Sequence, residues 1–186
     1  MKEQLDKELV EQVLDGHAEA FNLLVWRWQR PLYNFLFRLT GDRERARDIS
    51  QDSLLRAYTR LKDLRERDKF ASWLFRIAVN QVRSEYRSRQ AADAVWGGEL
   101  EPLDESHGPL DSETRELQLT VRALLGRLTP DQREVVVLKI YEGFRFDEIA
   151  GILDCPVSTV KSRLYAAFDQ LKAGLEAPAP RLRSVK

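Results

Sequence analysis

The sequence predicts an all-α protein in which a flexible acidic linker joins two small helical domains. Apolar residues recur at the three- and four-residue spacing of a helix face over most of the 186 residues. No segment shows the sustained alternation of a strand. Between residues 91 and 113 the helical spacing is lost, and Gly and Pro accumulate among seven acidic residues without a Lys or Arg. We therefore expect domains over 1–90 and 114–174, a linker over 91–113 and a flexible tail over 175–186.

The first domain should be a helical bundle, since apolar residues follow at helical intervals through Phe21, Val25, Trp28, Leu32, Phe35 and Leu39. Pro31 interrupts this stretch. It removes a backbone donor and clashes with the preceding turn, so we expect a kink or a break there. Gly41 should end the helix, and Asp42 should cap the next one.

The second domain should contain a helix-turn-helix. Thr129 to Gln132 combine three helix-start signals: a Thr cap, a Pro at the first position and a Gln that completes a capping box. This helix should stop at Gly143. A short helix with Ile149, Ala150 and Leu153, a turn at residues 154–156 and a longer helix capped by Ser158 should follow, the last extending to about Gly174.

Composition excludes several classes of protein. No apolar run approaches the roughly 20 residues that cross a bilayer, and the first ten residues do not form a signal peptide, so we expect a cytoplasmic protein without membrane insertion. His17, His107 and the single Cys155 make no recognisable metal site. Cys155 fits a buried or turn position better than a redox-sensing thiol. Without a phosphate-cradling loop or nucleophile signature, we expect no enzyme and no cofactor.

One helix in the first domain has a cationic stripe. Arg76, Asn80, Arg83 and Arg87 follow at i, i+4, i+7 and i+11 and therefore share a face. Phe70, Trp73 and Tyr86 lie beside this stripe in the sequence. Three guanidiniums, an amide and aromatic rings suit phosphate contacts and stacking of an unpaired base. A solvated charged face is the alternative reading.

The last helix also offers a candidate nucleic-acid surface. Val160, Leu164, Phe168 and Leu171 repeat at helical spacing and should face the core. The polar start of the helix then faces outward, as in a recognition helix that enters the major groove of DNA. Its candidate contacts are Ser158, Thr159, Lys161, Ser162 and Arg163. The alternative is an ordinary amphipathic helix with a solvated polar side.

Three segments resemble the extracytoplasmic-function (ECF) sigma factors of the sigma-70 family. Residues 70–80 (F-A-S-W-L-F-R-I-A-V-N) are similar to the F-x-x-W-L-x-R-I-A-x-N signature of region 2, and residues 48–52 (D-I-S-Q-D) look like the segment just upstream of it. Residues 141–164 resemble region 4. Two motifs in the right order, with an acidic linker between them, make the resemblance specific, and it extends over nearly the whole chain.

The resemblance implies a transcription initiation factor with three surfaces. Asp48, Ile49, Gln51, Asp52 and Leu55 would dock on the clamp helices of the largest subunit of core RNA polymerase, and region 4 on the flap of the second subunit. The minus-ten element would be melted and held as single-stranded DNA by Lys69, Phe70, Trp73, Arg76, Asn80, Arg83 and Arg87. The minus-thirty-five element would be read as duplex by Ser158, Thr159, Lys161, Ser162 and Arg163. The resemblance also implies control by an anti-sigma factor.

Three residues depart from the family pattern. Arg145 replaces the usual Ser or Thr cap, although Asp147 and Glu148 in the first turn should partly offset the loss. Asp154 replaces a turn Gly, and Glu85 borders the cationic stripe.

Two other readings compete with an initiation factor. A helix-turn-helix response regulator would need an alternating strand-helix domain at its N-terminus, and the periodicity excludes one. A sigma mimic could titrate an anti-sigma factor without binding DNA. Such a decoy would not need the cationic stripe, which argues against it.

We predict that limited proteolysis of the whole chain cuts first between residues 91 and 113, because that segment lacks both helical periodicity and charge pairing. Mass spectrometry of the first stable fragments checks this. A first stable cleavage inside residues 18–88 or 117–172 would show that the domain division is wrong.

Overall fold

The computed structural model describes residues 5–90, 120, 121 and 123–176, and the regular structure among these residues is entirely helical, which confirms the predicted fold class. The N-terminal half contains α1 (Asp6–Leu14), α2 (Ala20–Thr40), α3 (Arg43–Thr59) and α4 (Phe70–Gln90), with the short 3-10 turns η1 (Leu61–Asp63) and η2 (Arg67–Lys69) between α3 and α4. The C-terminal half contains α6 (Pro130–Val136), the π-helical η3 (Val137–Tyr141), α7 (Phe146–Leu153) and α8 (Val157–Glu176). The predicted linker and tail lie mostly outside these residues.

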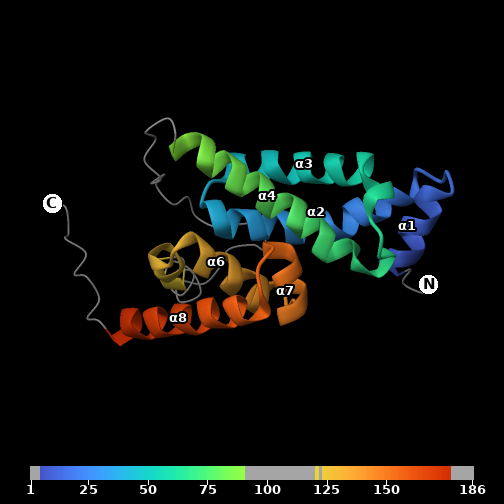
Figure 1. Cartoon of the computed structure of the whole chain (residues 1–186). Coiled ribbons are helices and arrows are strands. Elements are labelled where there is room, and N and C mark those ends of the chain that lie inside the picture. Colours follow the sequence, from blue (N-terminus) through green and yellow to red (C-terminus); the bar gives the residue numbers. More distant parts are fainter. Residues whose placement is uncertain (1–4, 91–119, 122, 177–186) are drawn as a thin grey trace, which may run out of the picture.

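The N-terminal half is a bundle in which α2 packs against both α3 and α4 (Figure 1). The bundle centres on Phe35, Phe70 and Phe75, whose side chains are fully buried. α2 continues through Pro31 as one helix, so the break considered from the sequence does not occur. The next turn buries Leu32, Phe35 and Leu36 completely, and this burial outweighs one lost backbone hydrogen bond.

The predicted boundary between α2 and α3 is confirmed. Gly41 ends α2 in the left-handed region at φ +71°, where a residue with a side chain would be strained. The Asp42 carboxylate accepts a hydrogen bond from the Arg45 N–H at 3.0 Å and so caps α3. This tight corner returns α3 alongside α2.

The capping box of α6 is also confirmed. Thr129 Oγ1 accepts from the Gln132 N–H at 3.3 Å, and Gln132 Oε1 accepts from the Thr129 N–H at 3.0 Å. After Val136 the helix widens to π geometry, and the chain leaves it at Gly143, with φ +74°. The predicted stop is therefore in place.

α7 and α8 form the predicted helix-turn-helix. Asp154 turns the chain in the left-handed conformation at φ +54°, which Asp tolerates better than most residues. At the start of α7, the Glu148 carboxylate accepts from the Arg145 N–H at 2.7 Å, which is one of the two bonds of a capping box. The bond that a Ser or Thr cap would accept from the helix is absent, and Asp147 and Glu148 partly offset its loss through the helix dipole.

Two details predicted for α8 are wrong. The helix begins at Val157, and its first main-chain bond runs from Val160 N to Pro156 O at 3.1 Å, so Ser158 lies in the first turn and does not cap it. Phe168 is 41% exposed, while Ala167 is fully buried with Val160. Eight residues advance a helix about 80° past whole turns, whereas seven return close to the starting line, so Ala167 takes the core position.

The two halves pack together in one structure (Figure 1). α7 lies against α4, and η3 lies against α2. The rings of Phe75 from α4 and Phe144 from the loop after η3 meet edge to face, with centroids 5.0 Å apart. Apolar burial therefore extends from one half into the other.

Within the described part of the chain, no helix has the length and apolarity needed to span a membrane. The same residues contain no group of three or more His, Cys, Asp or Glu placed to hold a metal ion. Cys155 is half-buried in the turn between α7 and α8.

Candidate nucleic-acid interface

The cationic stripe on α4 is only partly open to solvent. Arg76, Asn80 and Arg87 are exposed, as their helical spacing predicts. Arg83, in the middle of the stripe, is half-buried against the C-terminal half. The helix therefore presents three polar side chains outward and directs the fourth into the contact between the halves.

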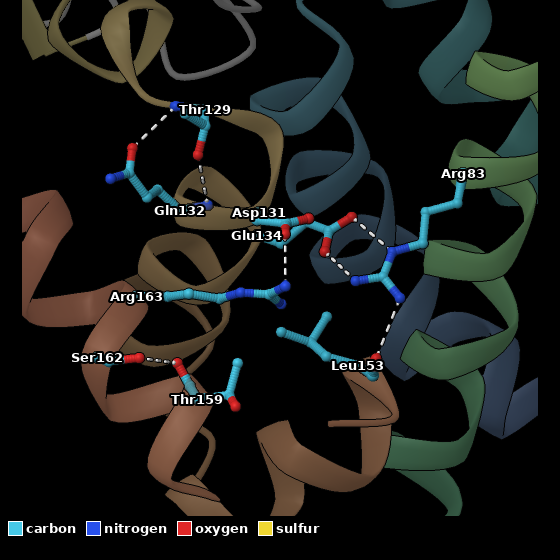
Figure 2. Close-up of polar contacts among 9 residues, drawn as sticks. All are labelled: Arg83, Thr129, Asp131, Gln132, Glu134, Leu153, Thr159, Ser162 and Arg163. Atoms are coloured by element: carbon cyan, nitrogen blue, oxygen red, sulfur yellow. Dashed lines mark hydrogen bonds and ion pairs between the residues drawn. The ribbon is translucent and has the colours of Figure 1, made fainter. Parts of the chain in front are cut away.

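Arg83 binds three oxygen atoms of the C-terminal half (Figure 2). Its Nε donates to Glu134 Oε1 at 3.1 Å, and its Nη2 donates to Glu134 Oε2 at 2.6 Å. Its Nη1 donates to the main-chain oxygen of Leu153 at 3.1 Å. Each nitrogen of the guanidinium is thus engaged by an acceptor from α6 or α7.

Glu134 is a functional candidate that the sequence reasoning missed. Its side chain is 6% exposed, and burial raises its pKa while the ion pair with Arg83 opposes this shift. The available signal was a carboxylate directly before the apolar run of Val135 to Leu138. A buried charge requires a cationic partner, and that partner lies 51 residues away in the sequence, beyond the range of helical periodicity.

Aromatic support for the α4 stripe comes from Trp73. Trp73 is half-buried and borders, with Lys69 and Arg76, a cleft of about 370 Å³ between the N-terminal half and α7. Phe70 is fully buried, with its ring 6.3 Å from that of Trp73, so its surface is used in the core. Lys69 Nζ lies 2.6 Å from the Glu66 carboxylate, and this contact raises the lysine pKa.

The start of α8 presents most of the second candidate surface. Ser158, Lys161 and Ser162 are exposed, and Thr159 is half-exposed. The Ser162 hydroxyl donates to the Thr159 main-chain oxygen at 3.0 Å. Arg163 instead turns toward α6, where its Nη2 lies 2.5 Å from Asp131 Oδ2 (Figure 2). Lys161 is therefore the cation of this set that is most open to a nucleic acid.

The candidate polymerase-docking residues lie along α3. Asp48, Gln51, Asp52 and Leu55 are exposed, and Leu55 is 61% exposed, whereas Ile49 is buried and packs beneath them. Glu85 of α4 borders this surface, a placement the sequence reasoning did not foresee. Burial raises the pKa of Glu85, and Asp48 and Asp52 add to the shift. The docking surface is thus an acidic face with one exposed leucine.

A second charged contact joins the halves at Glu142. Its carboxylate lies 4.0 Å from Arg38 of α2, and the Arg38 guanidinium stands over the Tyr141 ring at 4.3 Å from the centroid. Burial raises the pKa of Glu142 to about 7, and Arg38 opposes the shift. This glutamate therefore titrates near neutrality while the halves are packed.

Comparison with known protein families matches both halves. Residues 24–92 match the family described as Sigma-70 region 2, and residues 118–171 match Sigma-70, region 4. The chain is 34% identical to the ECF RNA polymerase sigma-E factor of Escherichia coli (strain K12), over 92% of this chain and 95% of that protein. It is 30% identical to the RNA polymerase sigma-H factor of Pseudomonas aeruginosa, over 95% and 96%.

Two solved structures show the same fold. One is CnrH in complex with the cytosolic domain of CnrY, with a TM-score of 0.71 and 30% identity over 94% of this chain and 99% of that chain. The other is the sigma factor RpoE in complex with the anti-sigma factor NepR from Bartonella quintana, with a TM-score of 0.69 and 26% identity over 84% and 97%.

We predict that lowering the pH strengthens the packing between the halves. Separation would hydrate Glu142 and return its pKa toward the ordinary 4.5, whereas the packed form holds the proton up to about pH 7. Between pH 4.5 and about 7, the equilibrium constant for packing of the halves should fall by up to about tenfold per pH unit as the pH rises. Above about pH 7 the constant should no longer change. Small-angle X-ray scattering at several pH values measures the change in size.

Glu142→Gln is the matched control and should flatten most of this dependence, because the amide does not titrate. The introduced amide stays neutral at every pH, as protonated Glu142 does at low pH, so the comparison isolates the effect of titration. A wild-type radius of gyration that stays constant across this pH window would contradict the prediction.

Proposed function

Because the chain belongs to the ECF group of the sigma-70 family of RNA polymerase sigma factors, we propose that it directs core polymerase to a particular set of promoters, using α4 to open the minus-ten element and α8 to read the minus-thirty-five element. It is a transcription initiation factor and not an enzyme. We expect it to act in the cytoplasm, where polymerase and promoters meet.

The observation that carries the minus-ten role is the exposed row of Arg76, Asn80 and Arg87 on α4 beside Trp73. Guanidiniums at this spacing can follow the phosphates of a single strand, and the Asn amide can bond the edge of an extruded base. Stacking on an aromatic ring returns roughly 1 to 3 kcal/mol per base, close to the cost of unstacking it. Each contact should therefore matter to opening.

The minus-thirty-five role rests on the exposed start of α8. Ser158, Thr159, Lys161 and Ser162 stand where a recognition helix meets base edges and phosphates. The ion pair between Arg163 and Asp131 fixes α8 against α6, and Arg163 would have to break this pair before it could contact DNA. We assign Lys161 the main phosphate contact for this reason.

Polymerase docking is assigned to the acidic face of α3. Asp48, Gln51 and Asp52 offer carboxylate and amide oxygens, and Leu55 offers an apolar contact, to the clamp helices of the largest subunit. The pKa of Glu85 is raised mainly by burial, and Asp48 and Asp52 add to the shift; a basic partner at this face would favour the charged carboxylates. Region 4 would contact the flap of the second subunit.

An anti-sigma factor is the second partner we propose. One similar structure is a sigma factor bound to the anti-sigma factor NepR, and the other is CnrH bound to the cytosolic domain of CnrY. By analogy, the regulator of this chain would cover the α3 docking face and release it on induction. Co-purification from the native host, in resting and induced cells, tests this.

We predict that Asn80→Ala and Arg87→Ala each reduce promoter opening severalfold while binding to core polymerase stays nearly unchanged, because docking uses α3. Permanganate footprinting of unpaired thymines measures opening, and a pull-down measures docking. Arg56→Ala, an exposed arginine on α3, is the control for removal of one positive charge. Normal footprints in both α4 variants would remove the strand-capture role, and no footprint with wild-type protein on a genome-wide promoter set would favour the decoy.

We also predict that Lys161→Ala weakens binding to all minus-thirty-five sequences alike and lowers the salt slope of binding by about one. Losing one phosphate contact removes released counterions without changing base readout. Fluorescence anisotropy against a set of duplexes at several salt concentrations measures both quantities. Lys172→Ala, near the other end of α8, should leave the salt slope unchanged, and equal slopes for wild type and Lys161→Ala would refute the assignment.

A further inference from the structure

Arg83 lies at the centre of the α4 stripe, but each of its three guanidinium nitrogens already donates to an oxygen of the C-terminal half. Two of its nitrogens donate to the two oxygens of Glu134, and the third donates to the Leu153 main-chain oxygen. In this arrangement Glu134 occupies the Nε–Nη2 edge of the guanidinium, so a DNA phosphate can bind that edge in the bidentate mode only by displacing Glu134. The packed chain therefore hides one of its own strand-binding groups.

The acceptors around Arg83 reproduce the chemistry of a phosphate. Glu134 supplies two oxygens that share one negative charge in the bidentate geometry that arginine prefers. Leu153 is the last residue of α7, and the free carbonyls at a helix C-terminus carry partial negative charge. The two Glu134 oxygens and the Leu153 oxygen thus offer the guanidinium three acceptors comparable to those of a phosphate.

A carboxylate of α6 also forms an ion pair with a second candidate DNA-contacting arginine. Asp131, one turn before Glu134 on α6, binds Arg163 of α8 at 2.5 Å (Figure 2). Two carboxylates of α6 thus engage one arginine from each candidate nucleic-acid surface. The Asp131 pair lies within the C-terminal half, so only the Glu134 pair depends on contact between the halves.

We propose that Glu134 is an intramolecular substitute for DNA phosphate, which closes the free chain on Arg83 and keeps α4 from binding a single strand until DNA displaces it. This inference rests on the proposed function of α4. It adds a state that the chain reaches without a partner. Opening of the chain and strand binding would then be coupled through a single guanidinium.

The rest of the contact between the halves supports such a switch. The Phe75 and Phe144 rings bury apolar surface, and Arg133 donates to the Leu39 main-chain oxygen at 3.0 Å. These contacts hold the halves near each other without involving the outward face of α4. The charged pair contributes less net stability, because desolvation of Glu134 offsets much of its attraction to Arg83. A closed state of this kind can open at moderate cost.

A route for the incoming strand is present beside the pair. A cleft of about 520 Å³ is bordered by Arg83, Tyr86 and Arg87 of α4 and by Asp131 and Glu134 of α6. Arg87 is exposed at this cleft, so a phosphate bound there would lie next to the Arg83 contact. The backbone could then exchange one anion for the other without a preceding complete separation of the halves.

The test uses the full chain with Glu134→Gln, which keeps the shape of the side chain and removes its charge. Closure is followed by energy transfer between dyes on Lys62→Cys and Ala173→Cys in a Cys155→Ala background, and strand binding by anisotropy of a short random-sequence single-stranded DNA at one salt concentration. We expect less of the closed form and about five- to thirty-fold tighter DNA binding. Asp169→Asn removes one exposed carboxylate of α8 and is the matched control, for which neither change is expected.

Two further variants distinguish the Arg83–Glu134 contact from general electrostatic repulsion between Glu134 and DNA. Glu134→Asp keeps the charge but shortens its reach, so it should tighten DNA binding by a smaller factor than Glu134→Gln. It serves as the test variant if Glu134→Gln impairs folding. Arg83→Ala should open the chain as Glu134→Gln does but without a gain in affinity, because it removes the competing group itself.

Unchanged energy transfer in Glu134→Gln would overturn the closure, and opening without tighter DNA binding would overturn the competition. Failure of the proposed α4 function is distinguishable from both, since Asn80→Ala and Arg87→Ala would then leave single-strand binding at the wild-type level.

Discussion

The bidentate ion pair between Arg83 and Glu134 fixes how the two halves of the chain lie against each other. Glu134 is buried in the C-terminal half and needs a cation, and Arg83 supplies it from the middle of α4. The third bond, to the Leu153 oxygen, places the end of α7 against the same helix. Because a guanidinium is planar, these three bonds hold Glu134 of α6 and the end of α7 in fixed positions around one side chain of α4.

Local features of the fold follow from the sequence because their causes lie within a few residues. Asp42 and Thr129 cap helices through bonds that span three residues, and Gly41 and Asp154 turn the chain through their own backbone angles. The predicted α8 stripe is correct at Val160, Leu164 and Leu171 and wrong only at Phe168, since Ala167 carries almost no hydrophobic signal while Phe168 carries much. A rule that ranks residues by hydrophobicity selects the larger side chain even when the smaller one faces the core.

Residues of the candidate site could be predicted from the sequence where helical spacing alone determines their exposure. They could not be predicted where a residue distant in the sequence determines the position of the side chain. Helical spacing placed Arg76, Asn80 and Arg87 on one open face. The same spacing put Arg83 with them, because it carries no information about α6. The proximity of Glu85 to Asp48 and Asp52 was missed for a similar reason, since these two residues belong to another helix. Ion pairs between elements depend on packing, which follows from the fold as a whole.

A side chain that recognises phosphate also binds a carboxylate readily. The two ligands differ in how many negative charges they bring and in how exposed these charges are to solvent. Glu134 is one buried charge, whereas a strand brings a row of phosphates that Arg76 and Arg87 can engage together. Phosphate binding is further favoured by release of condensed counterions, a gain that falls steeply with salt. The buried pair is screened much less. The balance between the closed chain and the strand-bound chain therefore depends on ionic strength, and added salt favours closure.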